Sequence, residues 1–483
     1  MTFLKNTSLF REQCFIAGKW INADNNKVFS VKNPFDGSTL GHVPECGTTE
    51  TRLAIEAAYA SWKKWRTLTP LQRSEILWRW SELILANKED LATLMTMEQG
   101  KSLTESRGEI DYANSFITWF AEEGRRVYGD VIASNKPGQH LLVIKQSVGV
   151  VGAITPWNFP AAMITRKCAP ALAAGCSVII KPAEETPFSA LALAVLAEEA
   201  GFPPGVFNVI TGIPEQIGNE LTSNPLVRKI SFTGSTAVGK QLMKQCASTI
   251  KKISLELGGN APFIIFDDAD LAAAVNGVMA SKFRNTGQTC VSANRILVHD
   301  SIYDAFTEKL ISAITELKSG NGLDNTVQLG PLINQAAIEK VEQHIQDAVA
   351  KGAKIVLGGK PLTALGKLFF EPTILTNVTA TMLVAKEETF GPVAALFRFH
   401  TEEEAIHMAN DTEFGLASYF YSKEIHRIWR ISEALEYGMV GVNTGIVSTE
   451  VAPFGGVKES GMGREGSKYG IDDYIEIKYL CIE

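Results

Sequence analysis

The sequence lacks the features typical of nucleic-acid-binding proteins, membrane proteins and secreted proteins. Its net charge is −7 and its pI is near 5.7, so no cationic excess favours binding to nucleic acid or anionic lipid. No stretch approaches 18 apolar residues, and residues 1–6 lack the pattern of a signal peptide. We therefore expect no nucleic-acid partner, no membrane partner and a cytoplasmic location.

Cysteine and histidine are few and scattered. The 7 cysteines are an odd number without any C-x-x-C pair, and the 7 histidines show no H-x-x-x-H spacing. In a chain of 483 residues, unpaired cysteines favour a reducing compartment over a disulfide framework. Dispersed histidines predict no catalytic metal.

The chain is too long for a single hydrophobic core, so two or more domains are expected. Amphipathic helices are predicted at 50–65 and 70–98, and a hairpin at 130–145. Strand and helix patterns alternate over 149–257 and again after residue 260, and residues 473–481 form a last strand. This alternation predicts an α/β fold with parallel sheets, the first of them a doubly wound nucleotide-type domain.

One cysteine stands in a polar, glycine-containing segment rather than an apolar one. Residues 283–290 read FRNTGQTC and end at Cys290. A lone cysteine is more often an inert core residue, but four polar neighbours make an apolar core implausible. Cys290 is our candidate nucleophile.

Two further segments supply groups that chemistry at a carbonyl requires. Glu256 closes an apolar run before two glycines, and we predict that it is a base; the alternative is an ion pair with Lys251 or Lys252. Asn158 follows the strand at 149–154, and its amide is predicted to stabilise an oxyanion; the alternative is a helix N-cap.

A glycine turn at 232–240, FTGSTAVGK, nearly matches a P-loop. The position that needs a hydroxyl for magnesium is Gln241, which argues against a nucleoside triphosphatase. A better interpretation is a strand feeding Gly234 and Ser235, followed by a helix whose N-terminus meets the pyrophosphate of a dinucleotide.

From about Phe15 to the C-terminus, these segments resemble the aldehyde dehydrogenase superfamily. The resemblance implies a Rossmann-type NAD(P)-binding domain at 1–127 and 147–258 and a catalytic domain at 259–458. It also implies a homodimer or homotetramer, formed through a small β element at 128–146 and 471–483. Further, it implies a set of cofactor-binding residues at strand ends and turns: Thr155, Pro156, Trp157, Lys181, Ala183, Glu184, Gly234, Ser235, Leu257, Glu388 and Phe390.

The cofactor preference depends on one carboxylate. Glu184 would accept hydrogen bonds from the free hydroxyls of the adenosine ribose and would repel a 2′-phosphate. We therefore predict NAD over NADP, although Lys181 would tolerate the phosphate. Without the resemblance, Lys181 and Glu184 would be interpreted as a helix cap or a surface ion pair.

The substrate is predicted to be a small aldehyde with a carboxylate tail. Arg166 and Arg284 flank the predicted site, and arginine matches a carboxylate bidentately. These segments resemble succinate-semialdehyde dehydrogenases, in which Ser448 matches a substrate-binding serine. Succinate semialdehyde is therefore the predicted substrate, with glutarate semialdehyde or a broader range of aldehydes as alternatives; either arginine alone is as often an ion-pair partner.

Two expectations separate this chain from other enzymes. A cysteine hydrolase or acyltransferase shares the nucleophile and the carboxylate, but has no use for Gly234, Glu184 or Glu388. Many members of the superfamily carry a second cysteine two residues after the nucleophile, where this chain has Ser292. We therefore predict no disulfide switch at Cys290.

Overall fold

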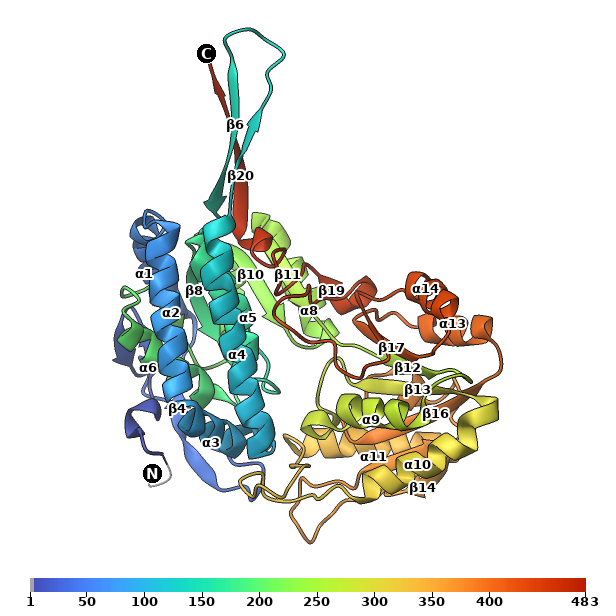
Figure 1. Ribbon diagram of the computed structural model, residues 1–483. Helices are drawn as coiled ribbons and strands as arrows, with labels where there is room; N and C mark the ends of the chain where they lie inside the picture. The colour runs from blue at the N-terminus through green and yellow to red at the C-terminus, as the bar shows by residue number, and fades with distance from the viewer. Residues whose placement is uncertain (1–3) are drawn as a thin grey trace.

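The computed structural model describes residues 4–483, arranged in two α/β bodies with a projecting β arm (Figure 1). The first body is built on an eight-stranded sheet and the second on a seven-stranded sheet. The predicted α/β class with a Rossmann-type parallel sheet is confirmed.

The first sheet has the strand order β19-β11-β10-β7-β8-β9-β1-β2. Its five central strands run parallel, and the strands at both edges are antiparallel. The bounds are β1 Cys14–Ile16, β2 Lys19–Ile21, β7 Val150–Ile154, β8 Ser177–Lys181, β9 Phe207–Val209, β10 Val227–Thr233, β11 Lys252–Glu256 and β19 Gly461–Met462. A separate two-stranded ribbon is formed by β3 Val28–Lys32 and β4 Thr39–Pro44.

Eight helices surround this sheet. They are α1 Thr48–Trp65, α2 Pro70–Ala86, α3 Lys88–Gln99, α4 Leu103–Glu123, α5 Ala162–Ala174, α6 Pro187–Ala200, α7 Pro214–Ser223 and α8 Thr236–Cys246. The prediction of one helix over 70–98 was wrong, because the helix is interrupted at Asn87, which separates α2 from α3. There the Asn87 side chain donates to the Leu83 carbonyl and accepts from Asn6, ending the first helix.

The second sheet has the strand order β14-β15-β16-β13-β12-β17-β18 and is parallel except at β14. Its strands are β12 Ala261–Ile265, β13 Ala293–His299, β14 Lys354–Leu357, β15 Thr373–Thr376, β16 Val393–Phe399, β17 Ala417–Tyr421 and β18 Met439–Val442. Its helices are α9 Leu271–Lys282, α10 Tyr303–Thr315, α11 Gln335–Ala350, α12 Leu383–Lys386, α13 Glu402–Asn410 and α14 Ile425–Ala434. Short 3₁₀ turns lie at Thr7–Leu9, Gly124–Arg126, Ala247–Thr249, Arg284–Gly287, Asp300–Ile302, Lys458–Ser460 and Asp472–Tyr474.

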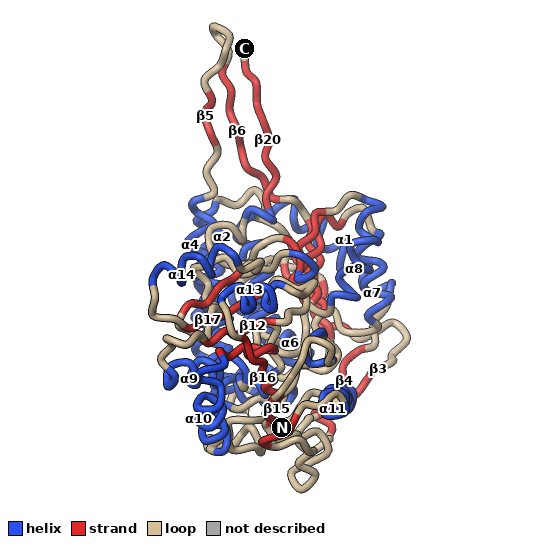
Figure 2. The backbone as a smooth tube through the Cα atoms, turned by 90° about the vertical axis from the view of Figure 1, so that its right-hand side faces the viewer, coloured by secondary structure: helices blue, strands red, loops and turns tan. Residues whose placement is uncertain are grey.

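The arm is a three-stranded sheet that extends away from both bodies (Figure 2). It contains β5 Asp130–Ile132, β6 His140–Ser147 and β20 Ile475–Ile482. The C-terminal strand pairs with the hairpin along its whole length, from Ile475 opposite Ser147 to Ile482 opposite His140. The last strand, predicted at 473–481, is therefore β20.

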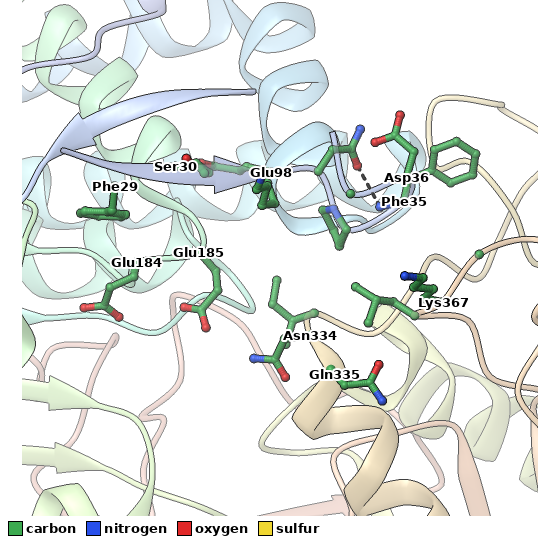
Figure 3. Close-up of a pocket in the computed structure, with 18 of the residues that line it drawn as sticks. Phe29, Ser30, Phe35, Asp36, Glu98, Glu184, Glu185, Asn334, Gln335 and Lys367 are labelled. Carbon is green, nitrogen blue, oxygen red and sulfur yellow. Dashed lines mark hydrogen bonds between the residues drawn. The ribbon is translucent and has the colours of Figure 1, made fainter. Parts of the chain in front are cut away.

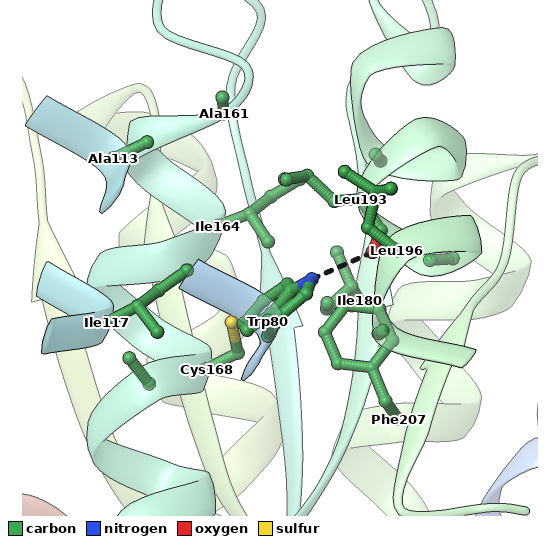
Figure 4. Close-up of a cluster of buried hydrophobic side chains, with 14 of the residues drawn as sticks. Trp80, Ala113, Ile117, Ala161, Ile164, Cys168, Ile180, Leu193, Leu196 and Phe207 are labelled. Carbon is green, nitrogen blue, oxygen red and sulfur yellow. Dashed lines mark hydrogen bonds between the residues drawn. The ribbon is translucent and has the colours of Figure 1, made fainter. Parts of the chain in front are cut away.

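Large aromatic side chains fill the space between the helices and the first sheet. Trp80 of α2 is fully buried and packs edge-on against Phe202 and Phe207, with ring centroids 5.6 Å and 5.4 Å away. Its indole N–H donates to the Leu193 carbonyl at 3.1 Å (Figure 4). Burying an aromatic ring and satisfying its polar atom holds α2 and α6 firmly against the sheet.

The register of the parallel strands sets where the candidate site lies. Ile154 pairs with Lys181 on one side and with Phe232 on the other, and Thr233 pairs with Glu256. The strands β8, β7, β10 and β11 therefore end almost level. Ligands bind at this carboxyl edge in open parallel sheets, because the loops that follow the strands converge there.

Candidate active site

The three predicted catalytic residues line one cavity of about 350 Å³. Asn158 follows β7, Glu256 is the last residue of β11, and Cys290 comes just before β13 of the second sheet. The cavity is therefore built from the facing edges of both bodies. Sequence motifs 132 residues apart, from Asn158 to Cys290, meet in one place.

Cys290 sits at the end of a strained turn. Asn285 and Thr286 have φ values of 50° and 57°, a left-handed conformation that only a surrounding network sustains in residues other than glycine. Burial and the charge of Glu388 raise the pKa of the Cys290 thiol to about 12, against the opposing effect of Arg166. The thiol is therefore protonated at neutral pH when no ligand is bound.

The Asn158 side chain is aimed at the same turn. Its Nδ2 donates one hydrogen bond to the Gln288 carbonyl at 3.1 Å, two residues before Cys290, and the second N–H remains available. The Asn158 backbone carbonyl accepts from Lys101 Nζ at 2.6 Å and from Asn285 Nδ2 at 3.1 Å. The donor is thus held in place from two directions.

Glu256 is buried, and within the described part of the chain its Oε2 has no hydrogen-bond partner. Burial and the neighbouring Glu465 raise its pKa well above the usual value. The alternative ion pairs are not formed, since Lys251 donates to the carbonyls of Asn224 and Val227 and Lys252 to that of Ile475. Glu256 is therefore free to act on a bound molecule.

Seven of the residues predicted to bind a cofactor line this cavity: Pro156, Trp157, Gly234, Ser235, Leu257, Glu388 and Phe390. Trp157 meets Phe390 edge-on with ring centroids 5.6 Å apart, and Phe390 has a strained φ of 58°. Glu388 accepts the Gly259 N–H at 3.2 Å, and burial raises its pKa to about 7.

The glycine turn after β10 is compatible with a dinucleotide. A Cβ at Gly234 would come within 2.4 Å of the Phe232 ring, and Ser235 caps α8 by accepting the Val238 N–H. Thr233 Oγ1 is buried without a partner in residues 4–483, which leaves a polar atom for a ligand. The residues present therefore fit NAD(P).

The remaining predicted cofactor residues lie outside this cavity. Thr155 joins β7 to β8 by donating its N–H to the Lys181 carbonyl, and Lys181 Nζ forms an ion pair with Glu184. Glu184 lines a second cavity of about 940 Å³, where it lies beside Glu185 and across from Asn334 (Figure 3). Ala183 accepts the Thr186 N–H at the turn into α6.

A third cavity of about 290 Å³ adjoins the cavity of Cys290, because Phe159 lines both. Arg284 and Ser448 both line it, as the substrate prediction requires. Arg166 lines neither cavity; its Nη2 lies 2.7 Å from the Glu465 carboxylate, and its guanidinium covers the Phe454 ring at 3.9 Å. The structure thus brings two of the three predicted substrate residues together.

The sequence analysis missed two buried ionic groups beside the site. Lys101 Nζ lies 2.6 Å from Glu109, and both side chains are fully buried. Lys167 pairs with Glu465, and the charges of Lys167 and Arg166 lower the pKa of Glu465 despite its burial. The glycine-rich segment 461–470 could have drawn attention to Glu465, but its partner Lys167 is 298 residues away in the sequence.

Across residues 4–483, no helix is long and apolar enough to cross a membrane. In the same range, no three His, Cys, Asp or Glu side chains group in a way that would hold a metal ion.

Comparisons with known proteins agree with this geometry. Residues 20–480 match the model of the aldehyde dehydrogenase family. The chain is 60% identical to a glutarate-semialdehyde dehydrogenase of Pseudomonas aeruginosa over 99% of both chains. It is 61% identical to the succinate-semialdehyde dehydrogenase [NADP(+)] of Escherichia coli, again over 99% of both. A solved structure described as an E. coli NADP-dependent enzyme superposes with a TM-score of 0.98, at 61% identity and over 99% of both chains.

Proposed function

Because the chain belongs to the aldehyde dehydrogenase family, we propose that it oxidises succinate semialdehyde to succinate with NAD(P)+. One observation carries this proposal: Phe159 is shared by the cavity of Cys290 and the cavity of Arg284 and Ser448. A short aldehyde with an anionic tail spans the two, with its carbonyl at the thiol and its carboxylate at the guanidinium.

The proposed reaction begins with attack of the Cys290 sulfur on the aldehyde carbon, which forms a thiohemiacetal. The negative oxygen accepts a hydrogen bond from the free N–H of Asn158 and from the Cys290 backbone N–H. The thiol must first release its proton to solvent, because burial favours its neutral form. A positively charged nicotinamide, if held by the residues that line the same cavity as Cys290, would favour the thiolate.

The nicotinamide of the bound cofactor supplies a hydride acceptor, and oxidation leaves a thioester on Cys290. Glu256 then takes a proton from water, which attacks the thioester carbon and releases the carboxylic acid and the Cys290 thiolate. A carboxylate with an unpaired oxygen in the same cavity supports this role. Hydrolysis of the thioester also makes the overall oxidation effectively irreversible.

We also propose a preference for NAD over NADP, which depends on Glu184. A carboxylate at the ribose accepts hydrogen bonds from free hydroxyls and repels a phosphate, but the paired Lys181 reduces that repulsion. The name of the E. coli relative specifies NADP(+), which points the other way. Greater kcat/KM with NAD+, and a gain with NADP+ in Glu184→Gln, would support the preference; equal efficiencies would contradict it.

Glutarate semialdehyde is the second candidate substrate, since a relative at 60% identity carries that name. One methylene in a pocket is worth only about 1–3 kcal/mol, so the two aldehydes are separated weakly. The cysteine hydrolase or acyltransferase alternative is not retained, because the family match spans the cofactor residues as well as the nucleophile.

The same proposal includes a homodimer or homotetramer assembled through the arm. Val131 and Ile477 on the arm are 86% and 73% exposed, which is unusual for apolar side chains in a strand. Exposed apolar strand surface favours pairing with another chain. The domain limits predicted at 1–127 with 147–258, at 259–458 and at 128–146 with 471–483 remain part of this proposal.

The test compares three aldehydes by following NADH or NADPH formation. Succinate semialdehyde and butyraldehyde have four carbons each, and only the first has a carboxylate; glutarate semialdehyde adds one methylene. We expect the highest kcat/KM for succinate semialdehyde and a much lower value for butyraldehyde. Equal values for the first two would refute the anionic-tail assignment, and a higher value for glutarate semialdehyde would favour the second candidate.

A further inference from the structure

The cavity lined by Arg284 and Ser448 contains a tyrosine that takes no part in the proposed reaction. Tyr112, on α4, lines the cavity with Arg284 and Ser448, and its ring meets Phe116 edge-on at 4.9 Å. Its Oη is buried and makes no hydrogen bond of normal geometry in residues 4–483, although the Ser448 side chain lies near enough to lower the pKa of the phenol. Buried hydroxyls are nearly always paired, because leaving one unpaired costs about 1–3 kcal/mol.

The surroundings of this hydroxyl favour donation to an anion. Burial raises the pKa of Tyr112, against the lowering effects of Arg166 and Arg284, so the phenol keeps its proton. A neutral phenol donates an O–H, and a hydrogen bond to a charged acceptor is roughly twice as strong as one to a neutral acceptor.

Arg284, which lines the same cavity, is not paired with a carboxylate of the described chain. Within the described chain no carboxylate lies within 4.0 Å of Arg284, whereas Arg166 is paired with Glu465. The Arg284 guanidinium lies over the Phe159 ring at 4.8 Å, which fixes it at the boundary of the two cavities. Its Nε is buried without a partner among residues 4–483.

Two carboxyl groups line the same cavity, Glu105 and Glu109, and Glu109 is paired with Lys101, so Glu105 is the one that would repel an anion if it were charged. Glu105 accepts the Asn285 N–H at 2.7 Å through one oxygen, and its other oxygen is buried without a partner in residues 4–483. Burial raises the pKa of Glu105, which weakens this repulsion. The cavity therefore presents the Tyr112 hydroxyl and the unpaired Arg284 guanidinium to its contents, whereas its other cation, Lys101, is paired with Glu109.

We propose that Tyr112 is a specificity-determining residue, whose hydroxyl donates a hydrogen bond to the anionic tail of the substrate beside Arg284 and Ser448. This inference rests on the proposed function and extends it to a residue on a different element. Tyr112 acts on the tail and not on the reacting carbon, which lies on the far side of Phe159.

The test is Tyr112→Phe, which removes one oxygen and keeps the ring packed on Phe116. We expect the KM for succinate semialdehyde to rise about tenfold or more, with kcat changed little, because only binding of the tail is weakened. Kinetics with butyraldehyde should not change. Tyr59→Phe, on α1 and outside both cavities, is the matched control and should behave as the wild type.

An unchanged KM for succinate semialdehyde, or equal losses with both aldehydes, would overturn the role of Tyr112. Calorimetric titration with succinate separates this failure from failure of the proposed function. If the wild type shows no preference for the acidic aldehyde, but Tyr112→Phe binds succinate less tightly than the wild type does, the succinate-semialdehyde assignment fails and the Tyr112 contact stands. If succinate binds both proteins equally, the Tyr112 contact is overturned.

Discussion

Cys290 and Glu256 lie in a cavity that favours their neutral forms, although the proposed chemistry needs both as anions. Burial is the largest cause for each pKa increase, and the negative neighbours Glu388 and Glu465 add to it. A group whose pKa is raised gains its negative charge only at higher pH, so both steps should become faster as pH rises.

We expect the rate of Cys290 alkylation by iodoacetamide to keep rising from about pH 7 to about pH 10 in the free protein, because the thiolate is the nucleophile. Added NAD+ should shift the profile to lower pH. The measurement uses a Cys481→Ser background, because Cys481 is exposed and would also react. A plateau below about pH 8 in the free protein would show that burial does not control this thiol.

Lys101 is a buried charge that positions Asn158, whose amide is proposed to stabilise the oxyanion. Its ammonium lies 2.6 Å from both Glu109 and the Asn158 carbonyl, and 3.9 Å from the Phe159 ring centroid. Glu109 in turn accepts the N–H groups of Ala161 and Ala162 at the start of α5. The pair therefore fixes the segment that carries Asn158.

Replacing Lys101 by Met should lower the free energy of unfolding by about 3–5 kcal/mol, because Glu109 is left as an unpaired buried charge. Denaturant unfolding measures this loss. The double variant Lys101→Met with Glu109→Leu should recover much of the stability, yet kcat should stay low because the Asn158 carbonyl has lost its donor. Recovery of kcat along with stability would show that the pair is only structural.

At the scale of elements, several helix ends depend on residues far along the chain. Helix α6 begins with Pro187, and its N-cap residue Thr186 makes no capping hydrogen bond. Instead, Glu98 at the end of α3 accepts the N–H groups of Phe188 and Ser189, each at 2.8 Å. One carboxyl therefore joins α3 to the helix that follows Lys181 and Glu184.

Glu98→Ala should destabilise the protein by about 1–3 kcal/mol, since two N–H groups at the start of α6 lose their acceptor in the interior. Thermal unfolding would record a lower Tm. Glu89→Ala on the exposed side of α3 is the control and should change the Tm little, because surface ion pairs contribute weakly. Equal effects of the two substitutions would contradict the capping role.

At the scale of the whole molecule, the arm is a three-stranded sheet that projects from the two bodies (Figures 1 and 2). Apolar side chains on its strands, such as Val131 and Ile477, are largely exposed. Isolated small sheets without a packed face are marginally stable in water. An assembly of copies would supply the missing contacts.

Ile477→Lys should shift the protein to a smaller oligomer in sedimentation velocity, because a charge replaces an apolar contact at the proposed interface. Lys478→Glu changes the charge of the next residue of β20, on the opposite face, and serves as the comparison. A monomeric wild type, or no shift in Ile477→Lys, would contradict assembly through the arm.

The sequence by itself determined the α/β class and the order of most strands along the chain, and it predicted Cys290, Glu256 and Asn158, which the structure brings into one cavity. These features are local: apolar β-branched runs alternate with helical spacing, and each motif carries its own polar and glycine flanks. Local patterns also explain why a single helix was predicted over 70–98. The apolar residues keep helical spacing across Asn87, although the helical backbone ends there and a new helix begins.

Only the tertiary structure decided which charged side chains pair with one another and which pKa values are raised. The sequence treated Arg166 and Arg284 alike, yet folding pairs the first with Glu465 and leaves the second facing the cavity that contains Tyr112. It also brings Lys101 to Asn158 and raises the pKa of both Cys290 and Glu256. These outcomes depend on burial and on contacts between segments far apart in the chain, and neither quantity is encoded in any short stretch of residues.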